Sequence, residues 1–142
     1  MLTNDDRVQI TEVLALHAYV ADEDLFDRMP DVFTSDAVYD MTGSGMGAFQ
    51  GIDTIREAAM RMAASGRAPQ AHFVTNVLIT SADDEAASAR SRGLMIMADG
   101  AVHAVTYDDT LRHENGNWRI ARRVITPLPA RSAAAPAPAP GP

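Results

Sequence analysis

Few side chains in this sequence can do acid–base or nucleophilic chemistry, because it contains no cysteine and no lysine; all twelve basic residues are arginine. The missing thiols exclude a cysteine nucleophile, a disulfide framework and thiolate-bound zinc or iron–sulfur centres. The missing amines exclude Schiff-base catalysis. Phosphate-loop, dinucleotide and nucleophile-elbow motifs are also absent. The side chains that remain for acid–base or nucleophilic chemistry are histidine, aspartate, glutamate, tyrosine, serine and threonine.

His72 is the first candidate. It lies early in a segment that is typical of a strand, where the two-residue period places His72, Val74, Asn76 and Leu78 on one face. Polar groups on an otherwise aliphatic face are typical of a pocket wall. The alternative interpretation is a histidine that is simply hydrogen-bonded in the core or exposed at the surface.

Carboxylate and phenol candidates come from two other places. Asp22 stands in an acidic turn after the first predicted helix, where an ordinary solvated carboxylate is the alternative interpretation. Tyr107, Asp108 and Asp109 interrupt an apolar strand. Tyr107 should share a face with His103 and Asp109, while Asp108 faces the other way. A charge at the edge of a sheet is the alternative for these aspartates.

No metal site is expected. His103 and His113 share a strand but would stand about 33 Å apart at the usual strand rise, so they cannot share an ion. We expect no organic cofactor either. The chain has eight methionines, which can form an adaptable apolar wall or simply fill the core.

The elements that would position these residues can be predicted from periodicity and turn chemistry. Apolar residues at three- and four-residue spacing predict helices first, and long apolar runs broken by Asp99-Gly100 and by Asn115-Gly116 predict hairpin-linked strands afterwards. Helices are expected at 5–21, 24–32 and 52–64, a loop at 42–51, and strands at 38–41, 71–80, 87–98, 101–113 and 118–126. This order indicates an α+β fold.

Length and charge limit the function further. The 142 residues fit one domain, here 1–128, followed by an Ala/Pro-rich tail at 129–142 whose composition predicts disorder. A net charge of −7 argues against nucleic acid or an anionic membrane as partner. The acidic start is unlike a signal peptide, so a cytoplasmic location is expected.

Four short motifs carry a family resemblance. They are F-x-x-D-A at 33–37, G-x-x-x-I at 51–55, His72-Phe73-Val74-Thr75-Asn76, and G-x-W-x-I at 116–120. With the order of elements, they make the chain resemble the nuclear transport factor 2-like superfamily, in its SnoaL-like branch, over about 3–128. The resemblance implies a cone-shaped, curved antiparallel sheet wrapped around three N-terminal helices, and a homodimer.

The resemblance also implies a site. In dehydratases of the family, a histidine at the place of His72 works with an aspartate at the place of Asp22. His17 falls where related enzymes have a pocket tyrosine, and Tyr107 lies near a polar pocket position. We therefore expect His72, Asp22, Tyr107 and His17 to be catalytic. Substrate-binding positions are expected at Tyr19, Asp40, Met41, Asn76, Met95, Met97, His103 and Asp109.

The expected function is proton transfer without a cofactor, in a dehydration, isomerisation or cyclisation of a hydrophobic oxygenated ring compound such as a polyketide, steroid or terpenoid intermediate. Two alternatives stay open. One is a non-catalytic module of the same fold that binds a ligand or a partner protein. The other is a hydrolase resembling epoxide hydrolases, in which Asp40 or Asp109 activates water.

Overall fold

The structure is a computed structural model that describes residues 1–131, 140 and 141. Helical elements come first and alternate with two short strands: α1 (Asn4–Asp22), η1 (Phe26–Arg28), α2 (Met29–Val32), β1 (Phe33–Asp40), η2 (Thr42–Ser44), β2 (Ala48–Gln50) and α3 (Ile52–Ala64). Four long strands follow: β3 (Ala71–Ala82), β4 (Ala86–Ile96), β5 (Val102–Glu114) and β6 (Asn117–Pro127). Most of the tail predicted for 129–142 lies outside the described residues.

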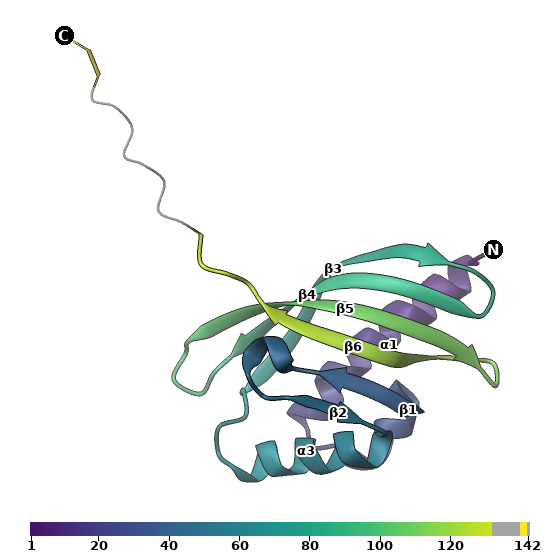
Figure 1. Cartoon of the computed structure of the whole chain (residues 1–142), viewed down its shortest axis with the longest axis horizontal. Coiled ribbons are helices and arrows are strands. Elements are labelled where there is room, and N and C mark those ends of the chain that lie inside the picture. The colour runs from purple at the N-terminus through teal and green to yellow at the C-terminus, as the bar shows by residue number, and fades with distance from the viewer. Residues whose placement is uncertain (132–139, 142) are drawn as a thin grey trace.

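The six strands form one curved sheet in the order β2-β1-β6-β5-β4-β3, with α1 across one face (Figure 1). β3 to β6 pair antiparallel, and the predicted hairpins at Asp99-Gly100 and Asn115-Gly116 are present. β1 instead runs parallel to β6. The α+β fold class is confirmed. The sheet is mixed and not purely antiparallel, because β1 enters directly from α2 and pairs with the free edge of β6. It is also open, with β2 and β3 as its two edge strands.

Two local predictions were wrong at the start of the sheet. β1 begins at Phe33, five residues before the predicted strand, and the short β2 lies inside the segment predicted as a loop. β2 pairs antiparallel with the end of β1. The predicted loop therefore contains the connection and the second strand of a hairpin. The connection places η2 next to the end of β6.

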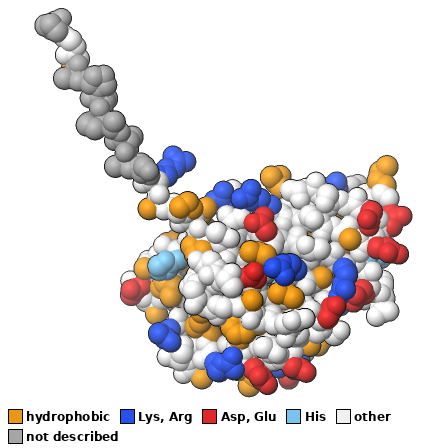
Figure 2. All heavy atoms as spheres, in the orientation of Figure 1, with side chains coloured by type: hydrophobic (Ala, Val, Ile, Leu, Met, Phe, Trp, Pro, Cys, Tyr) orange, Lys and Arg blue, Asp and Glu red, His pale blue; other side chains and the backbone are white. Residues whose placement is uncertain are grey.

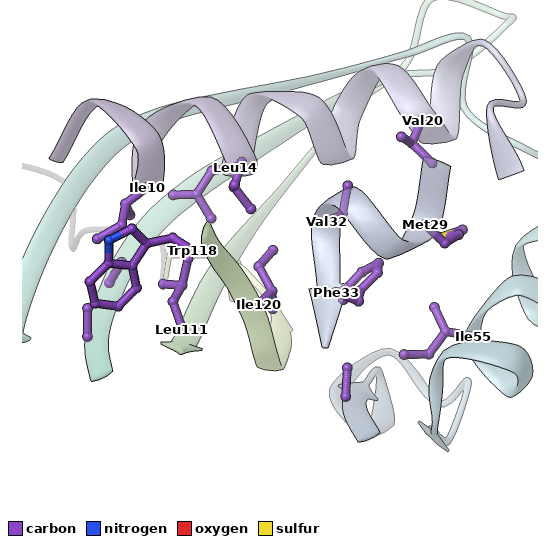
Figure 3. Packing of buried hydrophobic residues seen from close by; sticks show 14 residues of the cluster. Ile10, Leu14, Val20, Met29, Val32, Phe33, Ile55, Leu111, Trp118 and Ile120 are labelled. Atoms are coloured by element: carbon purple, nitrogen blue, oxygen red, sulfur yellow. The ribbon is translucent and has the colours of Figure 1, made fainter. Parts of the chain in front are cut away.

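The core lies between α1 and the concave face of the sheet. Ile10 and Leu14 of α1 pack with Leu111, Trp118 and Ile120 of β5 and β6, all essentially inaccessible to solvent (Figure 3). Full burial of such side chains stabilises the fold by about 1.5–3 kcal/mol each. This packing fixes the helix axis over the sheet and so fixes where its last turn lies.

Hydrogen bonds at the start of α1 hold this end of the helix in place. Thr3 and Asp6 form a capping box at its start, and the Trp118 indole N–H donates to Asp6 Oδ1 at 2.9 Å. That hydrogen bond, together with those from Thr3, lowers the pKa of Asp6 to about 2. The contact ties the first turn of α1 to β6.

No helix among the described residues is long and apolar enough to cross a membrane.

A bulge in β3 reverses the face predicted for half of that strand. The pairing with β4 shifts between Thr75 and Leu78, and Asn76 has a left-handed backbone with φ of 56°. Val74 and His72 keep the predicted inward face. Beyond the bulge, Asn76 and Leu78 are exposed, because one extra residue exchanges the two sides of a strand.

Candidate active site

An apolar cavity of about 360 Å³ lies at the end of the molecule where α1, α3 and β1 meet β3, β4 and β5. Aliphatic, aromatic and sulfur-containing side chains form nearly all of its wall. Six methionines take part: Met29, Met41, Met46, Met62, Met95 and Met97. The polar side chains that line it are His17, Tyr39, Arg67, His72 and His103. Few polar groups in an apolar wall are typical of a small-molecule site.

His72 is held by the Asp22 carboxylate at two points. Its ring nitrogen Nδ1 lies 2.5 Å from Asp22 Oδ1, and its backbone N–H donates to Oδ2 at 2.9 Å. Both side chains are mostly buried, with exposed fractions of 16% and 18%. Because an ionised carboxylate only accepts hydrogen bonds, Nδ1 carries the ring hydrogen. Nε2 is then the nitrogen free to accept a proton.

The backbone explains how two residues fifty positions apart meet. Asp22 is the last residue of α1, and His72 is the second residue of β3, which is an edge strand. Backbone N–H groups on the free side of an edge strand lack a strand partner. Asp22 accepts one of these N–H groups and thereby fixes the strand and the ring together.

His17 and Tyr39 form a second pair in the cavity wall. The Tyr39 hydroxyl lies 3.1 Å from His17 Nε2, and the two rings stack. Burial, with the nearby positive charge of Arg123, lowers the pKa of His17 well below its usual range. Burial also raises the pKa of Tyr39. At neutral pH, His17 is therefore uncharged and Tyr39 keeps its proton.

A buried ion pair lies behind this second pair. Arg123 has no solvent exposure, and its Nε and one terminal nitrogen donate to the two Asp109 oxygens at 2.8 and 3.0 Å. Its guanidinium carbon lies 3.9 Å from the centre of the Tyr107 ring. Tyr107 in turn contacts His17 edge-on, with ring centroids 6.4 Å apart. Neither Tyr107 nor Asp109 lines the cavity.

The structure brings some of the predicted site residues together and separates others. His72, His17, Met41, Met95, Met97 and His103 line the cavity, and Asp22 holds His72. Tyr19 is 60% exposed and Asn76 lies in the bulge, so neither reaches the cavity. No group of three or more His, Asp or Glu side chains that could hold a metal is present among the described residues.

Asp40 also lies outside the cavity, at the end of β1. The Thr42 hydroxyl and backbone N–H both donate to its Oδ1, at 2.7 and 2.9 Å, and lower the pKa of Asp40 below its usual range. Arg122 forms an ion pair with its other oxygen at 3.3 Å. Asp40 and Asp109 are thus occupied by structural contacts, which leaves no support for the water-activating alternative.

Three site residues were not predicted. Tyr39 could have been found from the sequence, since it stands two residues before Met41 and must share its face in a strand. Arg67, in the connection between α3 and β3, carries no such signal. Arg123 was missed because the two-residue period that buries Trp118 and Ile120 would place Arg122, and not Arg123, on the inner face.

Comparisons with known proteins agree with this fold. A family model described as a SnoaL-like domain matches residues 3–124. No curated protein sequence matches the chain significantly. Among solved structures, a candidate aromatic ring hydroxylase from Novosphingobium aromaticivorans is 27% identical, with a TM-score of 0.78, and the match covers 92% of this chain and 94% of that one.

Two more distant structures share the fold. A candidate scytalone dehydratase from Novosphingobium aromaticivorans is 17% identical, with a TM-score of 0.73 over 96% of this chain and 95% of that one. LinA is also 17% identical, with a TM-score of 0.73 and coverage of 93% and 95%. The resemblance predicted from the sequence is confirmed: the chain belongs to the SnoaL-like domain family.

Proposed function

We propose that the chain is an enzyme that transfers a proton, without a metal or an organic cofactor, on a hydrophobic oxygenated ring compound. The observation that carries the proposal is the hydrogen bond between Asp22 and His72 in the wall of an apolar cavity. The reaction is a dehydration, an isomerisation or a cyclisation, and each begins with removal of a proton next to a carbonyl or a hydroxyl-bearing carbon.

His72 is the general base in this proposal. The Asp22 carboxylate holds Nδ1 in its protonated form and stabilises the positive charge that develops when Nε2 takes up a proton. An apolar wall strengthens this stabilisation, because few water molecules screen the charges. Asp22 is the positioning residue, since it touches the base and not the substrate.

Tyr39 is the hydrogen-bond donor to the substrate oxygen. When His17 carries its hydrogen on Nε2, it donates to the Tyr39 oxygen, which leaves the phenolic O–H free to point at a substrate. A donor placed where negative charge develops lowers the barrier of proton abstraction. Tyr39 is proposed for this role in place of Tyr107, because Tyr39 lines the cavity and Tyr107 does not.

A search for deuterium exchange tests the proposal before the natural substrate is known. A panel of cyclic ketones and β-hydroxy ketones, including 2-tetralone, is incubated in D₂O and followed by proton NMR. The protein should accelerate exchange next to the carbonyl, and His72→Gln should reduce that rate about 10²–10⁴-fold, the usual contribution of a general base. His113→Gln, outside the cavity, is the matched control.

The non-catalytic alternative gives a different result in the same experiment. A binding module would take up members of the panel, as measured by calorimetry, without any exchange above the background rate. Exchange that persists in His72→Gln would rule out the proposed base. Circular dichroism of each variant shows whether the fold is kept.

The same fold supports a homodimer, which is the second part of the proposal. Phe73 of β3 pairs with Leu94 of β4 on the outer face of the sheet, where they are 51% and 37% exposed. Figure 2 shows hydrophobic side chains between charged ones over the face opposite α1. Sedimentation equilibrium of the wild type and of Phe73→Glu tests this: a monomeric wild type would contradict it.

A further inference from the structure

Two side chains that can bind an anion lie where the cavity opens. Arg67 and His103 both line the cavity and are both exposed, which places them at its mouth. Arg67 belongs to the connection between α3 and β3, and His103 lies near the start of β5. Two segments far apart in the sequence therefore each contribute one nitrogen-bearing side chain to the cavity wall.

Both side chains lack a partner within the described part of the chain. Most arginines pair with a carboxylate, as Arg90 does with Asp108 and Arg122 with Asp40. The guanidinium of Arg67 makes no ion pair, although its backbone N–H donates to Ser65 Oγ at 3.1 Å and so fixes the segment. Nor does the His103 ring make a hydrogen bond with any described residue.

The charges of the cavity wall are unlike those of the chain as a whole. The chain has a net charge of −7, yet none of the residues that line the cavity is an aspartate or a glutamate. The Asp22 carboxylate, which lies beside the cavity residue His72, is engaged by the backbone and ring of His72. An anion that enters the mouth meets the Arg67 guanidinium and no acidic side chain of the wall.

We propose that the substrate carries a carboxylate, which Arg67 and His103 bind at the mouth while the ring lies among the methionines. This inference rests on the proposed function, because the carboxylate would anchor the ring that His72 deprotonates. A planar guanidinium matches a carboxylate with two parallel hydrogen bonds. An imidazole adds a third donor. The apolar wall then selects an aromatic or alicyclic acid over a sugar acid.

Calorimetry with a matched pair of probes tests the inference without any turnover. 2-Naphthoate and 2-naphthamide have nearly the same shape but differ in charge. The wild type should bind 2-naphthoate about tenfold more tightly, a difference of about 1.4 kcal/mol. Arg67→Gln should remove most of this preference, because the loss of the guanidinium weakens the binding of 2-naphthoate more than that of 2-naphthamide. His103→Gln should reduce it in part.

Arg61→Gln is the matched control, because Arg61 lies on α3 outside the cavity and its loss changes the net charge equally. Equal affinity for the two probes, a preference that survives Arg67→Gln, or failure to bind either probe would overturn the inference. Loss of exchange in His72→Gln together with equal affinity for both probes would uphold the base and reject the carboxylate site. The two proposals therefore fail separately.

Discussion

A single carboxylate, that of Asp22, is hydrogen-bonded both to the backbone N–H of His72 and to its ring nitrogen Nδ1. The backbone contact fixes where the edge strand passes the end of α1. The ring contact fixes which nitrogen of His72 carries the hydrogen. The position of β3 and the tautomer of His72 therefore both depend on the side chain of Asp22. A substitution of Asp22 is for this reason more informative than a substitution of the base itself.

Replacement of Asp22 by Asn should preserve the fold and impair proton transfer. The amide oxygen can still accept the backbone N–H of His72, but an amide does not stabilise a developing imidazolium. We expect exchange to slow by about 10²–10⁴-fold. ¹⁵N NMR of the His72 ring should show a protonated Nδ1 in the wild type and a mixture of tautomers in the variant. Unchanged spectra and rates would show that Asp22 only shapes the backbone.

Removal of the Tyr39 hydroxyl should affect chemistry more than folding. Tyr39→Phe keeps the stacked ring but loses the donor to a substrate oxygen. The loss of one oxyanion donor typically slows the reaction about 10²–10³-fold. The initial rate of exchange and the affinity for 2-tetralone are measured together, and the affinity should change much less. Tyr19→Phe is the matched control, because Tyr19 is exposed outside the cavity. An equal loss in both variants would contradict the role of Tyr39.

Much of the fold could be predicted, because local chemistry specifies it. The Asp99-Gly100 and Asn115-Gly116 turns predict where the two hairpins turn. The three- and four-residue spacing of apolar residues predicts α1 and α3. The position of His72 on the cavity side follows from the two-residue period. Its pairing with Asp22 came from the family resemblance, since nothing local connects two residues fifty positions apart.

What could not be predicted depends on single inserted residues and on distant pairing. Counted from the β5–β6 turn, a regular register would place Arg122 opposite Asp109. A bulge between Thr110 and Leu111 shifts this register so that Arg123 faces Asp109 instead. The bulge at Asn76 exchanges faces in β3 in the same way. Such insertions leave no periodic signal in the sequence.

The Asp109–Arg123 pair should be costly to break. Asp109→Asn would leave a fully buried guanidinium without its counter-charge, which destabilises by about 3–5 kcal/mol in comparable buried pairs. Asp108→Asn, one residue away, removes an exposed partner of Arg90 at 3.6 Å and should cost at most about 1 kcal/mol. Urea unfolding measures both. Similar costs for the two variants would mean that Arg123 is stabilised by something other than Asp109.

His17 should make the fold sensitive to mild acid. Burial and the Arg123 charge hold the pKa of His17 well below its usual range in the folded state, while the unfolded chain has a pKa of about 6.5. Between these two pKa values the unfolded state binds more protons. The stability that neutral His17 contributes is therefore fully present above about pH 6.5 and is lost as the pH falls below it.

The comparison of the wild type with His17→Gln isolates this contribution, because glutamine does not titrate. Urea unfolding at pH 7.5, 6.5, 5.5 and 5.0 gives the free energy of unfolding of each protein. The wild-type advantage should shrink on acidification at up to about 1.4 kcal/mol per pH unit, the value for one proton taken up on unfolding. Carboxylates titrate in both proteins and cancel in the difference. Curves that stay parallel would mean that folded His17 accepts a proton as readily as the unfolded chain, and that the cavity wall around Tyr39 is open to water.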